Sequence, residues 1–163
     1  MPTKVKYVKP NKVYNFSKIE LMRPLYGWSS MIISEENGRI LDIPLSYLTE
    51  VHKDIIEIVE RYNKTNFAQL LEVDGEESGT YYIIFSLYEI IILQPYSKEI
   101  FKFQLKEHSL SNVFNSLLTS ITENIENWVD EFEECGMPEE KMSELTKKYY
   151  IQNLIDVINT NIK

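Results

Sequence analysis

The chain of 163 residues is 44% hydrophobic and 26% charged, a balance typical of one globular domain with a core of its own. Its one cysteine, Cys135, cannot form an internal disulfide, and its longest apolar run, residues 81–93, is shorter than the roughly 20 residues of a membrane-spanning helix. Composition therefore argues against a disulfide-stapled secreted scaffold and a helical membrane protein, and we expect a cytoplasmic protein.

The net charge of −8 is unevenly distributed. Residues 1–30 contain six basic residues and one acidic residue, whereas residues 123–144, which we call the acidic segment, contain nine acidic residues and one basic residue. The negative electrostatic field of the acidic segment would repel nucleic acid. It would attract a basic partner from beyond contact, within a Debye length of about 8 Å at physiological salt.

Residues 1–28 form an irregular basic segment in which one or two short edge strands can form, around Val5–Tyr7 and Val13–Phe16. Lysines alternate with these apolar residues and would protect an open edge from pairing with another chain. Basic and aromatic residues together are also the ingredients of a nucleic-acid surface. Because the segment is short and the chain as a whole is acidic, we do not expect nucleic-acid binding.

Residues 29–105 are predicted to form the sheet of the protein. Its first hairpin, 29–43, is indicated by Asn37-Gly38 between two apolar runs, because both residues tolerate the positive φ of a type I′ turn. Pro44 is expected to end the second strand of this hairpin.

A helix is predicted to interrupt the sheet at residues 46–62, with Ser46 as its N-cap. Apolar residues recur there at spacings of three and four, which places them on one face of a helix. The buried stripe is predicted to contain Leu48, Val51, Ile55, Ile58 and Tyr62.

The stretch with the densest β-branched and aromatic content, 79–105, is expected at the centre of the sheet. Before it, 67–73 is interpreted as a strand, although its composition also suits a helix. Residues 80–94 are either a hairpin or one long strand broken by a bulge, because the middle of this range lacks Gly and Asn. A turn at 95–98 then leads into 99–105, which we expect to be an outer strand.

Residues 110–162 are predicted to form a helical hairpin. The apolar spacing indicates one rod over 111–134, roughly 36 Å long at about 1.5 Å per residue. Gly136 and Pro138 suit the end of this helix and the first turn of the next one. The last helix, from Glu139 to about Asn161, is predicted to present an apolar face made of Met142, Leu145, Tyr149, Leu154, Ile155, Ile158 and Ile162.

These elements together predict a single α+β domain over residues 1–163. It consists of an antiparallel sheet of about five to six strands, with one central helix and the C-terminal α-hairpin packed on one face. The sequence leaves open which face of the sheet is exposed.

Few residues could carry a reaction. His52 and His108 stand far apart in the chain and in no metal-binding motif, and we expect surface or capping roles for both. Cys135 follows several glutamates at a predicted helix end, where the local field opposes thiolate formation. Nucleophile, phosphate-binding and EF-hand patterns are absent from the sequence. We therefore expect no enzymatic activity, no cofactor and no metal.

The acidic segment supports a more specific hypothesis. Its candidate partner-binding residues are Glu126, Asp130, Glu131, Glu133, Glu134, Glu139 and Glu140. We expect a small protein-binding protein of the immunity, antitoxin or inhibitor type, which occludes a basic partner such as a toxin nuclease. The first alternative is a homo-oligomeric assembly protein that forms a homodimer through its C-terminal helices. The second is an enzyme of unrecognised chemistry, which would require a pocket that gathers His52 or His108 with several acids.

Overall fold

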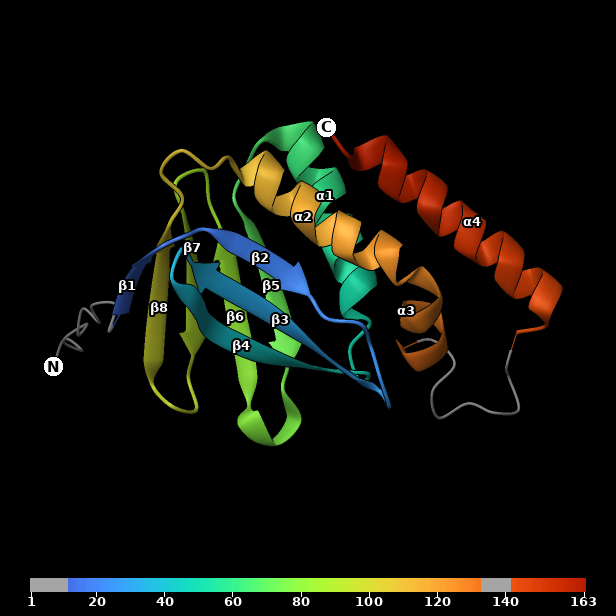
Figure 1. The fold of residues 1–163 in the computed structure, drawn as a ribbon, viewed down its shortest axis with the longest axis horizontal. Helices are drawn as coiled ribbons and strands as arrows, with labels where there is room; N and C mark the ends of the chain where they lie inside the picture. Colours follow the sequence, from blue (N-terminus) through green and yellow to red (C-terminus); the bar gives the residue numbers. More distant parts are fainter. Residues whose placement is uncertain (1–11, 133–141) are drawn as a thin grey trace, which may run out of the picture.

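The computed structural model describes residues 12–132 and 142–163 and has the expected α+β class (Figure 1). Along the chain its elements are β1 (Lys12–Asn15), β2 (Lys18–Leu21), β3 (Trp28–Glu35), β4 (Gly38–Ser46), α1 (Val51–Thr65), β5 (Gln69–Asp74), the 3-10 turn η1 (Glu76–Ser78), β6 (Thr80–Phe85), β7 (Glu89–Gln94), β8 (Glu99–Gln104), α2 (Leu110–Glu123), α3 (Ile125–Phe132) and α4 (Glu144–Asn161). These strands divide into two sheets, with the orders β1-β8-β7-β6-β5 and β2-β3-β4. The three-stranded sheet crosses in front of the five-stranded sheet in Figure 1.

The five-stranded sheet settles the question left open for residues 80–94. β6 and β7 form a hairpin, because the Ser86 N–H donates to the Glu89 carbonyl over 3.0 Å and the strands pair in antiparallel register. The predicted strand at 67–73 and the turn at 95–98 are confirmed by β5 and by the connection between β7 and β8. The prediction that 99–105 is an outer strand is wrong, because β1 pairs with β8 in parallel and forms the edge.

The chain passes from one sheet to the other at Phe16 and Ser17. The Phe16 N–H donates to the Gln104 carbonyl of β8, in the five-stranded sheet. The Ser17 N–H donates to the Ser34 carbonyl of β3, in the three-stranded sheet, and each hydrogen bond is 2.9 Å long. The neighbouring amides of Phe16 and Ser17 thus form hydrogen bonds with different sheets, and β1 and β2 form one bent ribbon (Figure 1). The lysine-rich sequence pattern gives no indication of β2.

The β3–β4 hairpin confirms the strand pair predicted over 29–43, but its turn differs from the predicted one. The connecting residues are Glu36 and Asn37, and Gly38 has a positive φ of 145° whereas Asn37 does not. A type I′ turn centred on Asn37 and Gly38 is therefore wrong. A bulge near the turn, where the register shifts between Ile33 and Ser34, accommodates one extra residue in β4.

Two predictions about the end of β4 are wrong. The strand continues through Pro44 to Ser46, because β4 lies at the edge of its sheet, where a residue without an amide proton is tolerated. Ser46 does not cap α1, which begins at Val51 after Glu50, and Glu50 makes no side-chain cap hydrogen bond. Leu48 is exposed rather than on the helix stripe, whereas the other four residues predicted for this stripe are buried.

The single rod predicted over 111–134 is broken at Asn124, whose N–H donates to the carbonyl of Ile121 over 3.2 Å. α2 ends there, and α3 continues in a different direction (Figure 1). The change of direction accompanies the complete burial of Trp128, whose ring stacks on that of His52 in α1 with centroids 5.5 Å apart. We attribute the break to this contact, since burying a large aromatic side chain outweighs the continuity of one helix.

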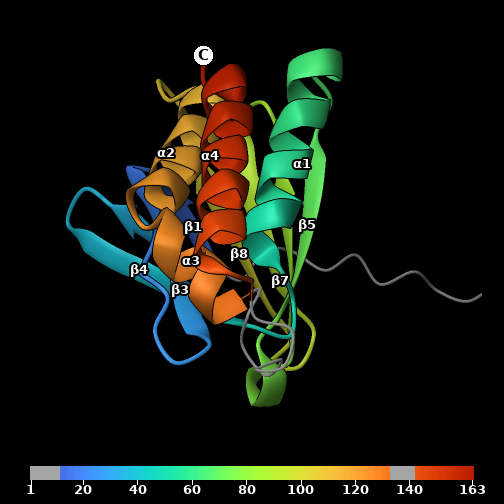
Figure 2. The ribbon, with the colours of Figure 1, turned by 90° about the vertical axis from the view of Figure 1, so that its right-hand side faces the viewer.

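α4 lies over α1 and α2 on the outside of the molecule (Figures 1 and 2). It begins at Glu144 rather than at residue 139, because the Ser143 side chain caps it by accepting a hydrogen bond from the Thr146 N–H over 3.2 Å. The predicted turn through Gly136 and Pro138 lies outside the described residues.

The predicted apolar face of α4 is only partly buried. Ile158 is fully buried, and Met142, Leu154 and Ile155 are half-buried. The remaining three predicted residues are exposed: Leu145, Tyr149 and Ile162. The helix therefore packs on the body of the molecule mainly through its C-terminal half.

The hydrophobic core lies between the two sheets and beneath α1 and α2. Phe114 of α2 contacts the rings of Phe85 and Tyr62, with centroid distances of 5.3 and 5.1 Å. Buried and less buried residues alternate along β5–β8, as period-two patterning requires. The inward residues of these strands include Leu71, Val73, Tyr81, Ile83, Phe85, Ile90, Ile92, Phe101 and Phe103.

Candidate functional site

The structure describes part of the acidic segment. Among the predicted partner-binding residues, Glu126 and Asp130 lie on α3. The Asp130 carboxylate forms an ion pair with the Lys147 ammonium of α4, so part of the predicted negative charge is neutralised within the molecule. The other candidates lie outside the described residues or have side chains that do: Glu131, Glu133, Glu134, Glu139 and Glu140. Their role in docking stays a prediction.

The two histidines have different surroundings. His52 is fully buried and stacks on Trp128, so the expectation of a surface or capping role is wrong for this residue. His108 is partly exposed and precedes Ser109, whose side chain caps α2. The ring of His108 contacts that of Phe16 edge to face, with centroids 5.2 Å apart. The fold thus keeps the two imidazoles apart.

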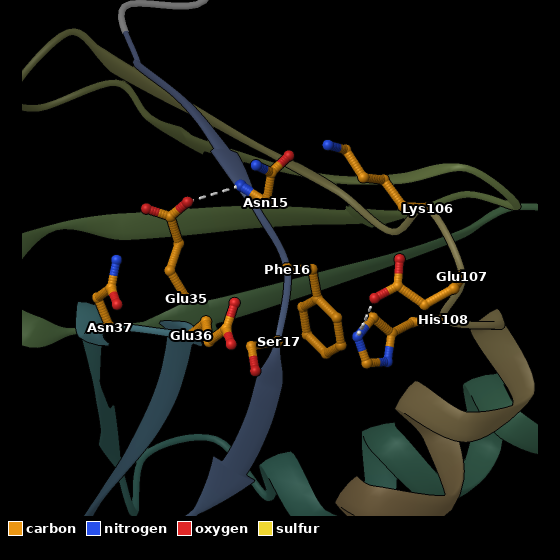
Figure 3. A pocket seen from close by; sticks show the side chains of 9 residues that line it. All are labelled: Asn15, Phe16, Ser17, Glu35, Glu36, Asn37, Lys106, Glu107 and His108. Atoms are coloured by element: carbon orange, nitrogen blue, oxygen red, sulfur yellow. Dashed lines mark hydrogen bonds and ion pairs between the residues drawn. The ribbon is translucent and has the colours of Figure 1, made fainter.

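A pocket of about 540 Å³ lies where β1 crosses to β2 (Figure 3). Residues 15–17 of the crossing, residues 35–37 of the β3–β4 turn and residues 106–108 before α2 line it. It gathers His108 with three glutamates, as the enzyme alternative required. The pocket is therefore the place where that alternative would have to operate.

Two acidic side chains of this pocket make contacts within it. Glu107 Oε1 lies 3.6 Å from His108 Nε2, which is too long for a hydrogen bond that would orient the imidazole. Glu35 accepts a hydrogen bond of 2.9 Å from the Asn15 backbone N–H, and Glu35 and Glu36 lie across the pocket from His108 (Figure 3). Within residues 12–132 and 142–163, no group of three His, Cys, Asp or Glu side chains could hold a metal ion.

A second surface feature is a cluster of exposed apolar side chains on the β2–β3 connection and on the chain between β4 and α1. Tyr26, its most exposed member, is 85% exposed. We call this cluster the aromatic tip, and its members are Met22, Leu25, Tyr26, Trp28, Tyr47 and Leu48. The Leu25–Trp28 turn lies against Tyr47, and exposed apolar groups that gather in this way typically mark a site of interaction.

Backbone contacts hold the aromatic tip in shape. Leu25 and Trp28 exchange hydrogen bonds of 2.8 and 3.1 Å. Between them Tyr26 and Gly27 have positive φ values of 53° and 79°, as a two-residue type I′ connection requires. The Tyr47 N–H donates to the Gly27 carbonyl over 2.9 Å, and a Cβ on Gly27 would lie 2.8 Å from the Tyr47 ring. The close approach of the two connections therefore requires glycine.

The aromatic tip lies at the same end of the molecule as α3, the helix that contains Glu126 and Asp130. Figures 1 and 2, which are turned by 90° from each other, both show the β2–β3 connection beside α3. Sequence reasoning missed the tip because Tyr26-Gly27 lacks the Asn or Asp that usually marks a type I′ turn. The sequence feature that could have indicated the tip is the density of Leu, Tyr and Trp over 25–28.

None of the helices in the described parts of the chain combines the length and the apolar content needed to cross a bilayer. In comparisons with protein-family models, with curated proteins and with solved structures, nothing matched this chain. The acidic segment, the pocket and the aromatic tip are therefore the features on which a functional proposal has to rest.

Proposed function

We propose that this protein binds a basic protein and occludes it, in the manner of an immunity-type, antitoxin or inhibitor protein. The observation that supports this proposal most directly is the aromatic tip beside the acid-bearing helix α3. A toxin nuclease is the kind of partner that fits, because proteins that act on nucleic acids carry basic surfaces.

The aromatic tip has the composition of an interface anchor. Tyrosine and tryptophan dominate the few interface residues that carry most of the binding energy, and this tip presents both on one tight turn. The hydrogen bonds around Gly27 fix the turn before binding, so docking would order few further groups. Such a rigid, apolar turn suits insertion into a cleft of the partner.

The acidic segment would steer the partner rather than anchor it. Asp130 is already paired with Lys147, so its carboxylate attracts a partner less than a free one would. Glu123 and Glu126 are exposed and keep their charge available to solvent. Charges at the rim of an interface mainly raise the association rate, and added salt screens them.

The tip is tested by capturing the partner from the native host on the immobilised protein and then measuring its affinity as a purified protein. The variant Tyr26→Ser with Trp28→Ala should lose at least about tenfold in affinity. Tyr96→Ser is the matched control, because Tyr96 is also a highly exposed tyrosine on a turn but lies outside the tip. Equal affinities of the tip variant and the control would argue against the tip as anchor.

The acidic segment is tested by reversing Asp130, Glu131, Glu133 and Glu134 to lysine. Association should slow, and its dependence on salt should become shallower. The matched control has the same change of net charge on exposed acids elsewhere, by reversal of Glu36, Glu77, Glu107 and Asp156. If neither the tip variant nor the segment variant changes the binding of the partner, the proposal is wrong.

A further inference from the structure

The outward face of the five-stranded sheet is unusually apolar. Strands with one face in water normally alternate apolar and polar residues, yet Leu70 of β5 is 55% exposed, and its outward neighbours Ile84 and Ile91 on β6 and β7 are half-buried. Glu72, two residues further along β5, is an exposed acid of the same face. The core and the three-stranded sheet lie on the opposite side, so this face points away from the viewer in Figure 1. We call it the outer face and define it by Leu70, Tyr82, Ile84, Ile91, Leu93 and Ile100.

The strand register makes this apolar surface continuous. Ile84 pairs with Leu70 on one side and with Ile91 on the other, which gives one row across three strands. Leu93 pairs with Tyr82 and with Ile100, which gives a second row beside it. At the end of the second row, an apolar pocket of about 410 Å³ opens at the β7–β8 turn. A partner surface could therefore bury both rows together.

We propose that a second copy of this chain packs on the outer face and forms a two-fold homodimer of face-to-face sheets. This interface differs from the pairing of C-terminal helices considered from the sequence. It is also independent of the aromatic tip, which lies on the β2–β3 and β4–α1 connections rather than on this sheet.

The charges on the outer face favour a second copy over a basic partner. Lys102 Nζ lies 2.8 Å from Glu89 Oε2, and the two residues belong to neighbouring strands that border the apolar rows. An isologous contact needs a surface that is complementary to itself, and a patch with both signs meets this condition.

The shape and area of the outer face set the expected strength of the dimer. Two copies have sheets of identical twist, which can pack face to face with aligned strands. Four strands of about six residues cover on the order of 20 by 20 Å, or about 400 Å². That is roughly half of the 800 Å² that each partner buries in a standard interface, so we expect a reversible dimer with a dissociation constant of about 10–100 μM.

Sedimentation equilibrium of the full chain, from about 5 μM to about 1 mM, tests this dimer. Ile84→Lys should raise the dissociation constant at least about 100-fold, because symmetry would bury two unpaired ammonium groups. Leu70→Lys should act in the same direction. Leu145→Lys is the matched control: this leucine of α4 is 62% exposed and lies where the helical interface would form.

The outcomes separate this interface from the others. Circular dichroism shows whether each variant is folded. If Ile84→Lys does not fold, Leu70→Lys tests the dimer instead, because an exposed leucine tolerates lysine in the monomer. A chain that stays monomeric to about 1 mM, a dimer that survives the sheet variants, or one that only Leu145→Lys disrupts would overturn the proposal. Added salt should leave this dimer intact while it weakens binding of a basic partner, so the two proposals can fail separately.

Discussion

Ser46 Oγ donates a hydrogen bond of 2.6 Å to Glu76 Oε1 and thereby joins the end of β4 to η1, the turn between β5 and β6. The same hydroxyl accepts a hydrogen bond of 3.2 Å from the Leu48 N–H. Ser46 is fully buried, and Glu76 is held in place by its own N–H, which donates to Asp74 Oδ1 over 2.7 Å. One side chain thus connects the two sheets at the end where α1 begins.

Ser46→Ala should lower the free energy of unfolding by about 1–3 kcal/mol, because the hydrogen bond between the buried Ser46 hydroxyl and the Glu76 carboxylate is lost. Urea denaturation measures the change. A double-mutant cycle with Glu76→Ala should give a coupling energy of about 1 kcal/mol or more. Glu77→Ala, on the neighbouring exposed residue of η1, should give none. Equal coupling with both glutamates would show that the contact between Ser46 and Glu76 is not specific.

Asp54→Asn should make stability less sensitive to pH. Burial raises the pKa of the Asp54 carboxyl above its ordinary value of 3.8, and the charges of Glu57 and Glu50 raise it further. As the pH rises above that ordinary value, the unfolded chain releases this proton first. The folded state then holds more protons, and the free energy of unfolding falls until Asp54 ionises in the folded state too.

The introduced asparagine side chain does not titrate, so the variant should be more stable than the parent at about pH 7, with an advantage that shrinks towards about pH 3. Urea denaturation across this range measures the difference. Glu77→Gln removes one exposed carboxylate and serves as the control, with little change expected at any pH. An advantage that is constant with pH would mean that helix propensity, and not the carboxyl group, causes it.

Local patterns predicted the elements whose signals are contained in a few residues. The strands on either side of 36–37 and of 95–98 are apolar runs rich in β-branched residues that end at a turn, and both hairpins formed where the sequence placed them. The stripe from Val51 to Tyr62 was predicted in the same way, since its spacing alone defines the buried face of α1.

Predictions failed where a distant residue decides the local structure. Ser46 has the side chain of an N-cap, but Glu76, thirty residues further along the chain, engages its hydroxyl. The spacing over 111–134 is that of one continuous helix, yet the contact between Trp128 and His52 accompanies a break at Asn124. The aromatic tip likewise depends on contact between two connections that are separated in sequence by β3 and β4, which no local pattern reveals.

Gly27→Ala should destabilise the aromatic tip more than the equivalent change at Gly38. Both glycines have positive φ, so alanine strains the backbone at each by about 1–2 kcal/mol. A Cβ on Gly27 would also lie 2.8 Å from the Tyr47 ring, whereas one on Gly38 would meet no atom within 4 Å. The difference between the two variants therefore reports the contact with Tyr47.

Urea denaturation of both variants measures this difference, and we expect the free energy of unfolding to fall by about 1 kcal/mol more for Gly27→Ala. The same variant should weaken binding of a captured partner, because the tip would no longer be fixed before docking. Equal destabilisation of the two variants would show that the Tyr47 ring moves aside at no cost.

The two tryptophans, Trp128 at 0% exposure and Trp28 at 40%, should respond differently to substitution. Trp128→Phe should lower the free energy of unfolding by about 1–3 kcal/mol, because it leaves a cavity beside His52, whereas Trp28→Phe should cost less than about 0.5 kcal/mol. Fluorescence distinguishes the sites, since each variant keeps one tryptophan. Trp28→Phe should leave a blue-shifted emission that resists quenching by acrylamide, and Trp128→Phe a red-shifted emission that is readily quenched. If both variants emitted alike, the break at Asn124 would have to be explained without the burial of Trp128.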